Sequence, residues 1–435
     1  MKELDPNVLA LDLPPDRTRS LSSAQIAARL MLIARDLDDG WVLSSQDYKA
    51  GEMITHAQSC MWIVGWSRLA DALNEGIDVH AKFACQMLGI ELEDFNKNIL
   101  LHKNLRQAAK VPNFSKAGGG GDATMVLQYR KQGEDTPFEG GPSMIDDGEG
   151  NLIPGFKGAR FCTLMRGTYC GIDERGRKNK TMVWPLEGDR QRKIKPTCRA
   201  CLECMAELSR TWKQTWPENI TYRKYVSSCI DNGMVIEPQH LELWPWWQDV
   251  FQPNQQLDRM QIAQHWSGRL RKVGSEKENP FCVVSNGFFQ ALLSDISKLA
   301  YRICSRECYD RTYRVPTQLF WNSVPSPYAG MQSPLFGSRL PIFAHDELLG
   351  EHPRSMGHDA STRIAHVMLD VMRYVCPDLA QAAEVKPTLM AAWDKRAEMV
   401  VHNDRVVPWT REHNSKQCGE CAAQKQRDDA RKAAA

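Results

Sequence analysis

The sequence predicts an α+β fold. Apolar residues recur every three or four positions, as along one face of a helix, in four long segments: 21–38, 49–73, 286–309 and 357–375. Two shorter segments, 41–48 and 338–353, contain apolar runs that end on polar residues, which is typical of buried strands. The second half of segment 338–353 has the pattern of a returning strand, so this segment predicts a tight β-hairpin. Residues 133–197 follow neither pattern and are interpreted as an irregular insertion.

The size and composition set broad limits on the class of protein. With 435 residues the chain can bury one large core or form two to three domains. Its 42% apolar and 25% charged residues are those of a soluble globular protein. The most apolar run, 61–66, is far shorter than a membrane span, and the N-terminus lacks the layout of a signal peptide. We therefore expect a cytoplasmic protein without a membrane partner.

Acidic residues stand where both predicted strand segments end. Asp47 closes the first segment, and His345, Asp346 and Glu347 occupy the tip of the predicted hairpin. Carboxylates at the end of a core strand are held rigidly, and they lose hydration energy unless a cation or hydrogen bonds compensate. Two interpretations follow for the hairpin tip: an exposed charged turn, or part of a site that binds cations.

A second candidate site is a basic helical face. Arg106, Lys110 and Phe114 are spaced by four, which places them on one side of a helix. Two cations beside an aromatic ring suit a phosphate group attached to a flat base. The alternative is a solvated helix face. Pro112 is expected to kink or shorten this helix.

Four motifs in a fixed order resemble those of family A DNA polymerases, the short phage-type members above all. They cover residues 41–409, and each is weakly specific alone. The motifs are Asp47-Tyr48-Lys49-Ala50-Gly51-Glu52, then Arg106-x3-Lys110-x3-Phe114, then Asn286 to Asp295 with Gln290 inside it, and finally His345-Asp346-Glu347.

The resemblance implies a right-hand polymerase architecture. An antiparallel β palm and mainly helical fingers are expected, without a full thumb or an exonuclease domain. The implied division is an N-terminal arm (1–40), a first palm part (41–98), fingers (99–280) that include the 133–197 insertion, a second palm part (281–409) and a flexible tail (410–435).

The resemblance also implies template-directed DNA synthesis by a two-metal mechanism. Two Mg²⁺ ions would be held by Asp47, Asp346 and the backbone carbonyl of Tyr48, with Glu347 as a supporting carboxylate near the primer end. A catalytically idle relative that binds nucleic acid or scaffolds a replication complex is the alternative. Retention of the paired carboxylates favours the enzyme.

The remaining motif residues would bind the incoming nucleotide and the DNA. Lys110 and Arg106 would hold the dNTP phosphates, and Lys110 could protonate the pyrophosphate. Phe114 and Tyr48 belong to the implied nucleotide site, where Glu52 would exclude the 2′-hydroxyl of ribose. The implied contacts with primer-template DNA come from three residues: Asn286, Gln290 and His345.

The chain also departs from the family pattern. Gly118 stands where the family has a tyrosine on the fingers helix, which affects template placement or fidelity. Only about 40 residues precede the first motif, so we expect a second polypeptide to supply the thumb or the exonuclease as part of a split polymerase. A phage-encoded chain of this kind would act in the cytoplasm of the host cell.

Cysteines predict a structural metal site. The chain has fourteen, and four of them, Cys162, Cys170, Cys198 and Cys201, could close a tetrahedral Zn²⁺ site that orders the insertion. An iron–sulfur cluster or buried free thiols are the alternatives. The insertion also holds a strongly basic segment, 157–200, which either contacts phosphates or forms a solvated loop. Cys418 and Cys421 are interpreted as an isolated pair, too few for a site.

Overall fold

The computed structural model divides the chain into two compact units. One unit contains residues 1–55 and 293–435, and the other contains residues 56–292. The residues that the structure describes are 40–97, 99–122, 124–125, 128, 144–146, 152–154, 199–232, 262–264, 266, 270–272, 281–394, 397–414 and 417–434. No described helix has the length and apolarity that a bilayer requires of a spanning segment.

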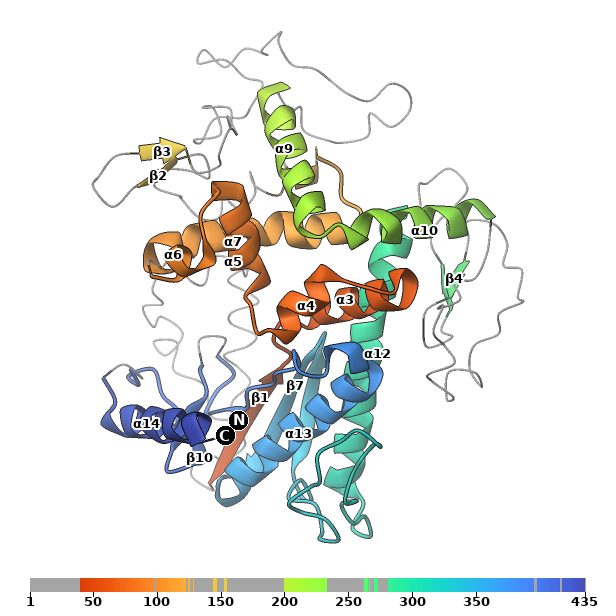
Figure 1. Cartoon of the computed structure of the whole chain (residues 1–435). Helices are drawn as coiled ribbons and strands as arrows, with labels where there is room; N and C mark the ends of the chain where they lie inside the picture. The colour runs from red at the N-terminus through yellow and green to blue at the C-terminus, as the bar shows by residue number, and fades with distance from the viewer. Residues whose placement is uncertain are drawn as a thin grey trace, which may run out of the picture. The chain divides into compact units, whose positions relative to one another are not determined.

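A six-stranded sheet forms the centre of the first unit (Figure 1). Its strands, in spatial order, are β6 (Arg339–Ala344), β7 (Glu347–Pro353), β1 (Trp41–Asp47), β8 (Thr388–Met390), β10 (Arg405–Trp409) and β9 (Val400–His402). The first strand of the chain therefore lies between two strands from its C-terminal part. The predicted strand at 41–48 and the hairpin at 338–353 are both confirmed.

The prediction of a purely antiparallel sheet is wrong at one pair. β10 runs parallel to β8, whereas the other paired strands of this sheet are antiparallel. The reason is the β9–β10 hairpin. The chain leaves β8, runs in the opposite direction along β9 at the sheet edge, and returns as β10 between the two. A strand that returns in this way has the direction of β8.

Both faces of β1 are covered by apolar groups, which explains why its apolar residues do not simply alternate with exposed ones. On one face Val42 packs with Leu389 and Val406. On the other face Leu43 packs with Leu349 and Trp393.

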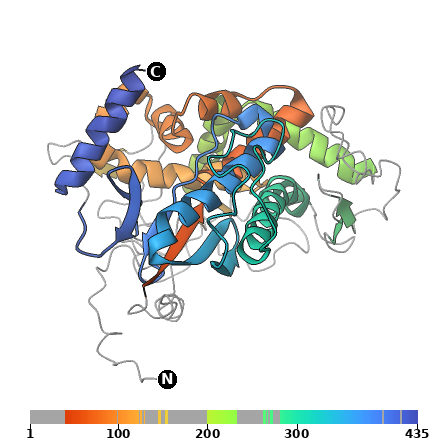
Figure 2. The same cartoon turned by 90° about the horizontal axis from the view of Figure 1, so that it is seen from below.

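Helix α13 (Gly357–Val375) covers the Val42 face of the sheet (Figure 2). Its bounds are those predicted from the apolar spacing, and the residues of that spacing are buried. Gly357 allows the helix start to approach the sheet closely, because an added Cβ would lie 3.0 Å from Val42. The short 3₁₀ turns η4 (Arg354–Met356) and η5 (Pro377–Leu379) flank α13.

A buried ion pair links α13 to the C-terminal half of helix α12 (Phe281–Tyr309). The side chains of Arg363 and Glu307 are 1% and 0% exposed. The guanidinium donates to both carboxylate oxygens, at 3.0 and 2.7 Å, and Ser333 Oγ donates to Glu307 at 2.6 Å. This bidentate geometry satisfies a carboxylate that would otherwise be costly to bury.

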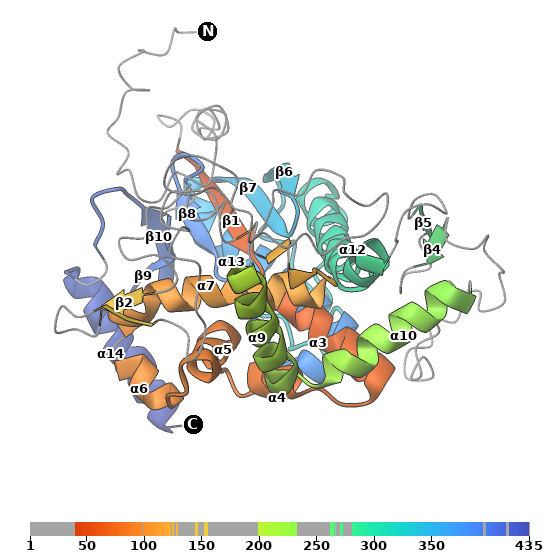
Figure 3. The same cartoon turned by 90° about the horizontal axis from the view of Figure 1, so that it is seen from above.

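The second unit is mainly helical. Its elements are α4 (Arg68–Asn74), α5 (Val79–Leu88), α6 (Leu92–Lys97), α7 (Ile99–Ala117), α9 (Arg199–Thr215) and α10 (Glu218–Asn232), with the short hairpins β2 (Met144–Asp146)–β3 (Leu152–Pro154) and β4 (Ile262–Gln264)–β5 (Leu270–Lys272). Helices α5, α7 and α9 pack against one another (Figure 3).

Asn113 joins these three helices. Its Oδ1 accepts hydrogen bonds from the indoles of Trp212 and Trp216 at 3.1 and 3.2 Å, and its Nδ2 lies 2.9 Å from Nδ1 of His80. Pro112 does not shorten the helix, since α7 continues to Ala117. Asn113 directly follows Pro112, and its buried hydrogen bonds stabilise the helical turn that the proline weakens.

Two helical predictions need correction. The single helix predicted over 49–73 is divided into α3 (Gly51–Val64) and α4, since Gly65 adopts a φ of 85° and Ser67 caps the start of α4. The tail predicted to be flexible contains α14 (Gly419–Ala434), which packs against β9. Gln424 anchors α14 through two hydrogen bonds to Asp404.

Candidate active site

Strand pairing brings together the acidic residues of two distant segments. Asp47 is the last residue of β1, and in the antiparallel ladder it lies opposite Glu347, the first residue of β7. Asp346 occupies the turn directly before Glu347. The structure therefore places all three predicted carboxylates at one end of the sheet.

The turn between β6 and β7 is as short as a hairpin allows. Only His345 and Asp346 separate the strands, and His345 has a φ of 58°. This left-handed conformation is uncommon for side chains other than Asn, Asp and His, so a histidine suits the position. A tight turn of two residues also fixes the register of the carboxylates that flank it. The His345 side chain is exposed.

Glu347 is held in place by two donors. Ser45 Oγ and Trp393 Nε1 both donate to its Oε1, at 2.6 and 2.7 Å. Sequence reasoning did not find these supporting residues, because Trp393 lies in a segment without regular spacing. A carboxylate oriented in this way is suited to support a metal site.

The three carboxylates strongly influence one another. Partial burial and the negative charges of Asp346 and Glu347 raise the pKa of Asp47 from its usual 3.8 to about 7. Burial also raises the pKa of Asp346, and its side chain is close enough to Asp47 for the two to share a hydrogen bond. A divalent cation between them would relieve this repulsion.

An open pocket of about 350 Å³ lies over these groups, within the first unit. Its lining includes Ser45, His345, Lys386, Thr388 and Asp394 beside the three carboxylates. Carboxylate oxygens with room for water and phosphate are the ligand set that Mg²⁺ prefers. The donors present therefore fit the two Mg²⁺ ions that the sequence predicts.

Tyr48 and Glu52 follow Asp47 directly. The Tyr48 hydroxyl donates to the Met368 carbonyl at 3.0 Å, so its buried side chain has a structural role. Glu52 is half-buried in the first turn of α3. The metal contact predicted for the Tyr48 carbonyl and the sugar contact predicted for Glu52 stay predictions.

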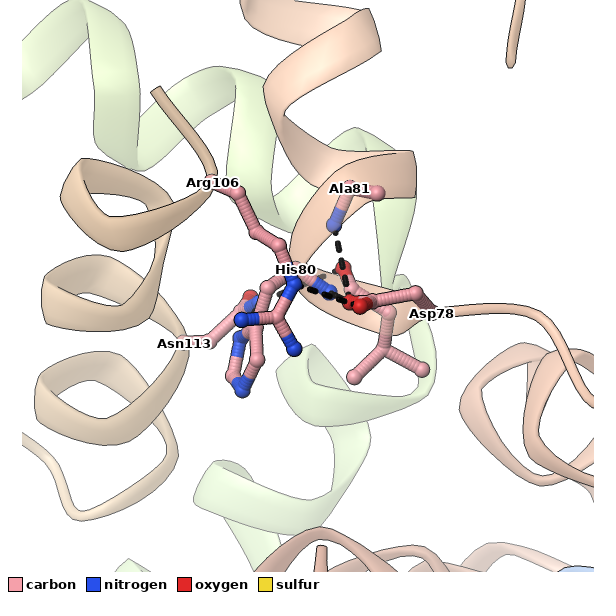
Figure 4. Close-up of polar contacts among 6 residues, drawn as sticks. Asp78, His80, Ala81, Arg106 and Asn113 are labelled. Atoms are coloured by element: carbon pink, nitrogen blue, oxygen red, sulfur yellow. Dashed lines mark hydrogen bonds and ion pairs between the residues drawn. The ribbon is translucent and has the colours of Figure 1, made fainter. Parts of the chain in front are cut away.

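The predicted basic face of α7 lies against the start of α5 (Figure 4). Arg106 Nε is 2.5 Å from Oδ2 of Asp78, which also caps α5 by accepting from the backbone N–H groups of His80 and Ala81. The sequence analysis assigned no role to Asp78, although an Asp before a helical segment is a signal for an N-cap.

Lys110 and Phe114 share this side of α7. The Phe114 ring lies 5.3 Å from that of His80 and is 38% exposed. Burial and the charge of Arg106 lower the pKa of Lys110, which makes its ammonium group a better proton donor. The three residues predicted to bind a nucleotide thus occur on one face, with two cations and an accessible ring.

Gly118 is explained by its contact with Asn286. The Asn286 Nδ2 donates to the Gly118 carbonyl at 3.2 Å, and a Cβ at residue 118 would overlap the Asn286 amide. A tyrosine could occupy this position only if the Asn286 side chain moved. Gln290 lies one turn after Asn286 and is exposed. Their predicted contacts with DNA stay predictions.

The predicted zinc ligands fall outside what the structure describes. Cys162, Cys170 and Cys198 lie outside the described residues, and Cys201 lies in α9 but its side chain is not described. This part of the metal prediction is therefore untested.

Comparisons with known proteins found likenesses among solved structures. No family model matches the chain, and no curated protein does. Among solved structures, the POL domain of Pol1 from M. smegmatis, in complex with DNA primer-template and dNTP, matches with a TM-score of 0.47 and 13% identity. The match covers 89% of this chain and 44% of the other, so the chain spans less than half of that protein. A likeness of this degree is too distant to identify an activity.

Proposed function

We propose that the chain is a DNA-directed DNA polymerase of the family A type. It would transfer dNMP from a dNTP to the 3′-hydroxyl of a primer on a DNA template. The observation that carries this proposal is the meeting of Asp47, Asp346 and Glu347 around an open pocket. The order of the four polymerase-like motifs in the sequence supports it.

The carboxylates have distinct roles in this proposal. Asp47 and Asp346, together with the Tyr48 carbonyl, would hold two Mg²⁺ ions. Bound Mg²⁺ would lower the pKa of the primer hydroxyl and neutralise the leaving pyrophosphate. Glu347, oriented by Ser45 and Trp393, supports the site near the primer end.

The basic face of α7 binds the nucleotide. Arg106 exchanges its Asp78 partner for the terminal phosphate of the dNTP, and Lys110 contacts the phosphates and protonates the pyrophosphate. Phe114 stacks on the base or the sugar. Glu52 excludes the 2′-hydroxyl, which makes the substrate a deoxynucleotide.

The template-primer duplex is contacted by Asn286, Gln290 and His345. Asn286 and Gln290 would read minor-groove acceptors, which are similar for all base pairs. His345 would contact the terminal phosphate of the primer. The second polypeptide expected from the sequence stays a prediction.

Primer extension with Mg²⁺ tests the proposal. Asp47→Asn and Asp346→Asn should each lower the rate by about 1,000-fold or more, because several kcal/mol of charge stabilisation is lost. Asp310→Asn is the matched control. This exposed carboxylate lies in the same unit and bonds to Thr312, a contact that an amide oxygen can keep.

Two results would count against the proposal. If Asp346→Asn extends a primer as well as the unchanged protein, the carboxylates are not catalytic. If the unchanged protein binds primer-template DNA but never extends it, the idle nucleic-acid-binding relative is the better description.

A further inference from the structure

Four metal-ligating side chains meet at the C-terminal end of the first unit. They are His402, His413, Cys418 and Cys421, whose ligand atoms all lie within 4.8 Å of one another. The interpretation of Cys418 and Cys421 as an isolated pair is therefore wrong. Two histidines from an earlier part of the chain complete the group. All four side chains are half-buried.

The distances match a single tetrahedral ion. Nε2 of His402 lies 3.6 Å from the sulfur of Cys418 and 3.6 Å from that of Cys421, and Nε2 of His413 lies 3.4 Å from Cys421 Sγ. Tetrahedral zinc with Zn–S of about 2.3 Å and Zn–N of about 2.0 Å requires sulfur–nitrogen separations of about 3.6 Å.

A carboxylate orients one of the imidazoles. Nδ1 of His402 lies 2.5 Å from Oε2 of Glu420, while its Nε2 faces the two thiols. Histidines that bind metals commonly use the second ring nitrogen in this way, which fixes the tautomer and the ring orientation. Glu420 is therefore a positioning residue for this group.

The backbone explains how the four ligands meet. His402 is the last residue of β9, and Asn403 and Asp404 form the turn to β10 with positive φ values of 50° and 62°. Cys418 precedes α14, and Cys421 lies in its first turn, so a spacing of three puts both thiols on one side of the helix. Figure 3 shows α14 beside β9 and β10.

We propose that His402, His413, Cys418 and Cys421 bind one structural Zn²⁺ ion. Four protein ligands leave no open coordination position, which is the mark of a structural rather than a catalytic site. The mixed sulfur and nitrogen donors suit zinc and not the Mg²⁺ of the carboxylate pocket. The ion would fasten α14 to the sheet edge formed by β9 and β10, beside the contact between Gln424 and Asp404.

The geometry disfavours the other metal centre that uses two Cys and two His. In a Rieske cluster the histidines bind one iron and the cysteines bind the other. Here Cys421 Sγ approaches both histidine nitrogens, as around one ion. A disulfide between Cys418 and Cys421 is the competing state, and it would prevent zinc binding.

Zinc content of the full-length protein tests the inference. The protein is purified with zinc present, exchanged into zinc-free buffer and analysed by mass spectrometry for metal. The Cys418→Ser/Cys421→Ser variant should hold about one equivalent of zinc less than the unchanged protein. Cys282→Ser, at an exposed cysteine of the other unit, is the control and should lose none. Counting the difference keeps the test valid if the cysteines of the insertion also bind zinc.

Two further measurements cover a variant that fails to fold. Glu420→Gln leaves all four ligands in place and should weaken zinc affinity by about 10-fold or more. Replacement of zinc by Co²⁺ should give the visible spectrum of tetrahedral cobalt with thiolate ligands. Equal zinc in the double-serine variant and the unchanged protein would overturn the proposal, as would a Cys418–Cys421 disulfide in protein purified under reducing conditions.

Discussion

Carboxylates are treated in two opposite ways within the first unit. Glu307 is completely buried, and Arg363 and Ser333 satisfy it with short hydrogen bonds. Asp47 lies at an open pocket, where desolvation and the charges of Asp346 and Glu347 raise its pKa. One carboxylate has its cation built into the fold. The other is surrounded by like charge.

The difference distinguishes a carboxylate that stabilises the fold from one that we propose binds a metal ion. A protein can bury a charge stably when the counter-charge is part of the same core. A cluster of like charges at a pocket does not stabilise the fold. A binding site for a cation from solution explains such a cluster better. The following predictions test this distinction, beginning with the largest expected effect.

Glu307→Gln should lower the free energy of unfolding by about 3–5 kcal/mol, because the buried guanidinium of Arg363 loses its counter-charge. Urea denaturation measures the loss. The double variant Glu307→Gln/Arg363→Met should recover part of it, since no buried charge then remains. A loss below about 1 kcal/mol, the size seen for exposed ion pairs, would remove the contrast between the two regions.

Mg²⁺ binding should depend on pH around the pKa of Asp47, which is about 7. Below this pH the folded protein keeps a proton on Asp47 that Mg²⁺ must displace, so the apparent affinity should fall by about tenfold per pH unit. Thermal unfolding with and without Mg²⁺ measures this: the gain in Tm should be larger at pH 8 than at pH 6. An equal gain at both pH values would contradict a carboxylate metal site.

Asp47→Asn should raise the stability of the metal-free protein by about 1 kcal/mol at pH 8, a value discounted for the solvent screening of an exposed side chain, while it lowers the rate of primer extension by about 1,000-fold or more. The sign follows from the raised pKa. Above pH 7 the ionised Asp47 disfavours the folded state, and as the pH falls through 7 protonation relieves this cost. The gain should therefore shrink towards pH 5. Asp310→Asn, the control, should show no such gain at either pH.

Trp393→Phe should have the smallest effect. The ring is kept and one hydrogen bond to Glu347 is lost, but Ser45 still donates to the same oxygen. The expected weakening of Mg²⁺ binding is a few-fold, or about 0.5–1 kcal/mol. Calorimetric titration with Mg²⁺ measures it, and Ser45→Ala/Trp393→Phe should show a larger loss than either single change.

The parts of the fold that the sequence predicted share strong local patterns. α13 has a long helical apolar spacing, and β1 and the β6–β7 hairpin each have a short apolar run that ends on polar residues. Asp47 and Asp346 could therefore be placed at strand ends before the register was known.

The features that escaped prediction depend on contacts between distant segments. β8 and β9 contain three residues each, too few for any periodicity, so the position of β10 between them left no signal. The pairing of Arg106 with Asp78 depends on the packing of α5 on α7. The group that includes His402 and Cys418 forms only when α14 packs against β9. The polar sequence of the tail gives no signal for this packing.

The central place of β1 in the sheet has a consequence for synthesis on the ribosome. β1 pairs with β7 and β8, so its neighbours are made about 300 residues after it. At about 5–20 residues per second, roughly 15–60 s pass before Glu347 can lie opposite Asp47. During this interval β1 has no strand partner and its apolar faces are uncovered. Contacts between residues so distant along the chain form slowly. Nascent chains that stop short of β7 would expose β1 to chaperones and to aggregation, and they would lack two of the three carboxylates.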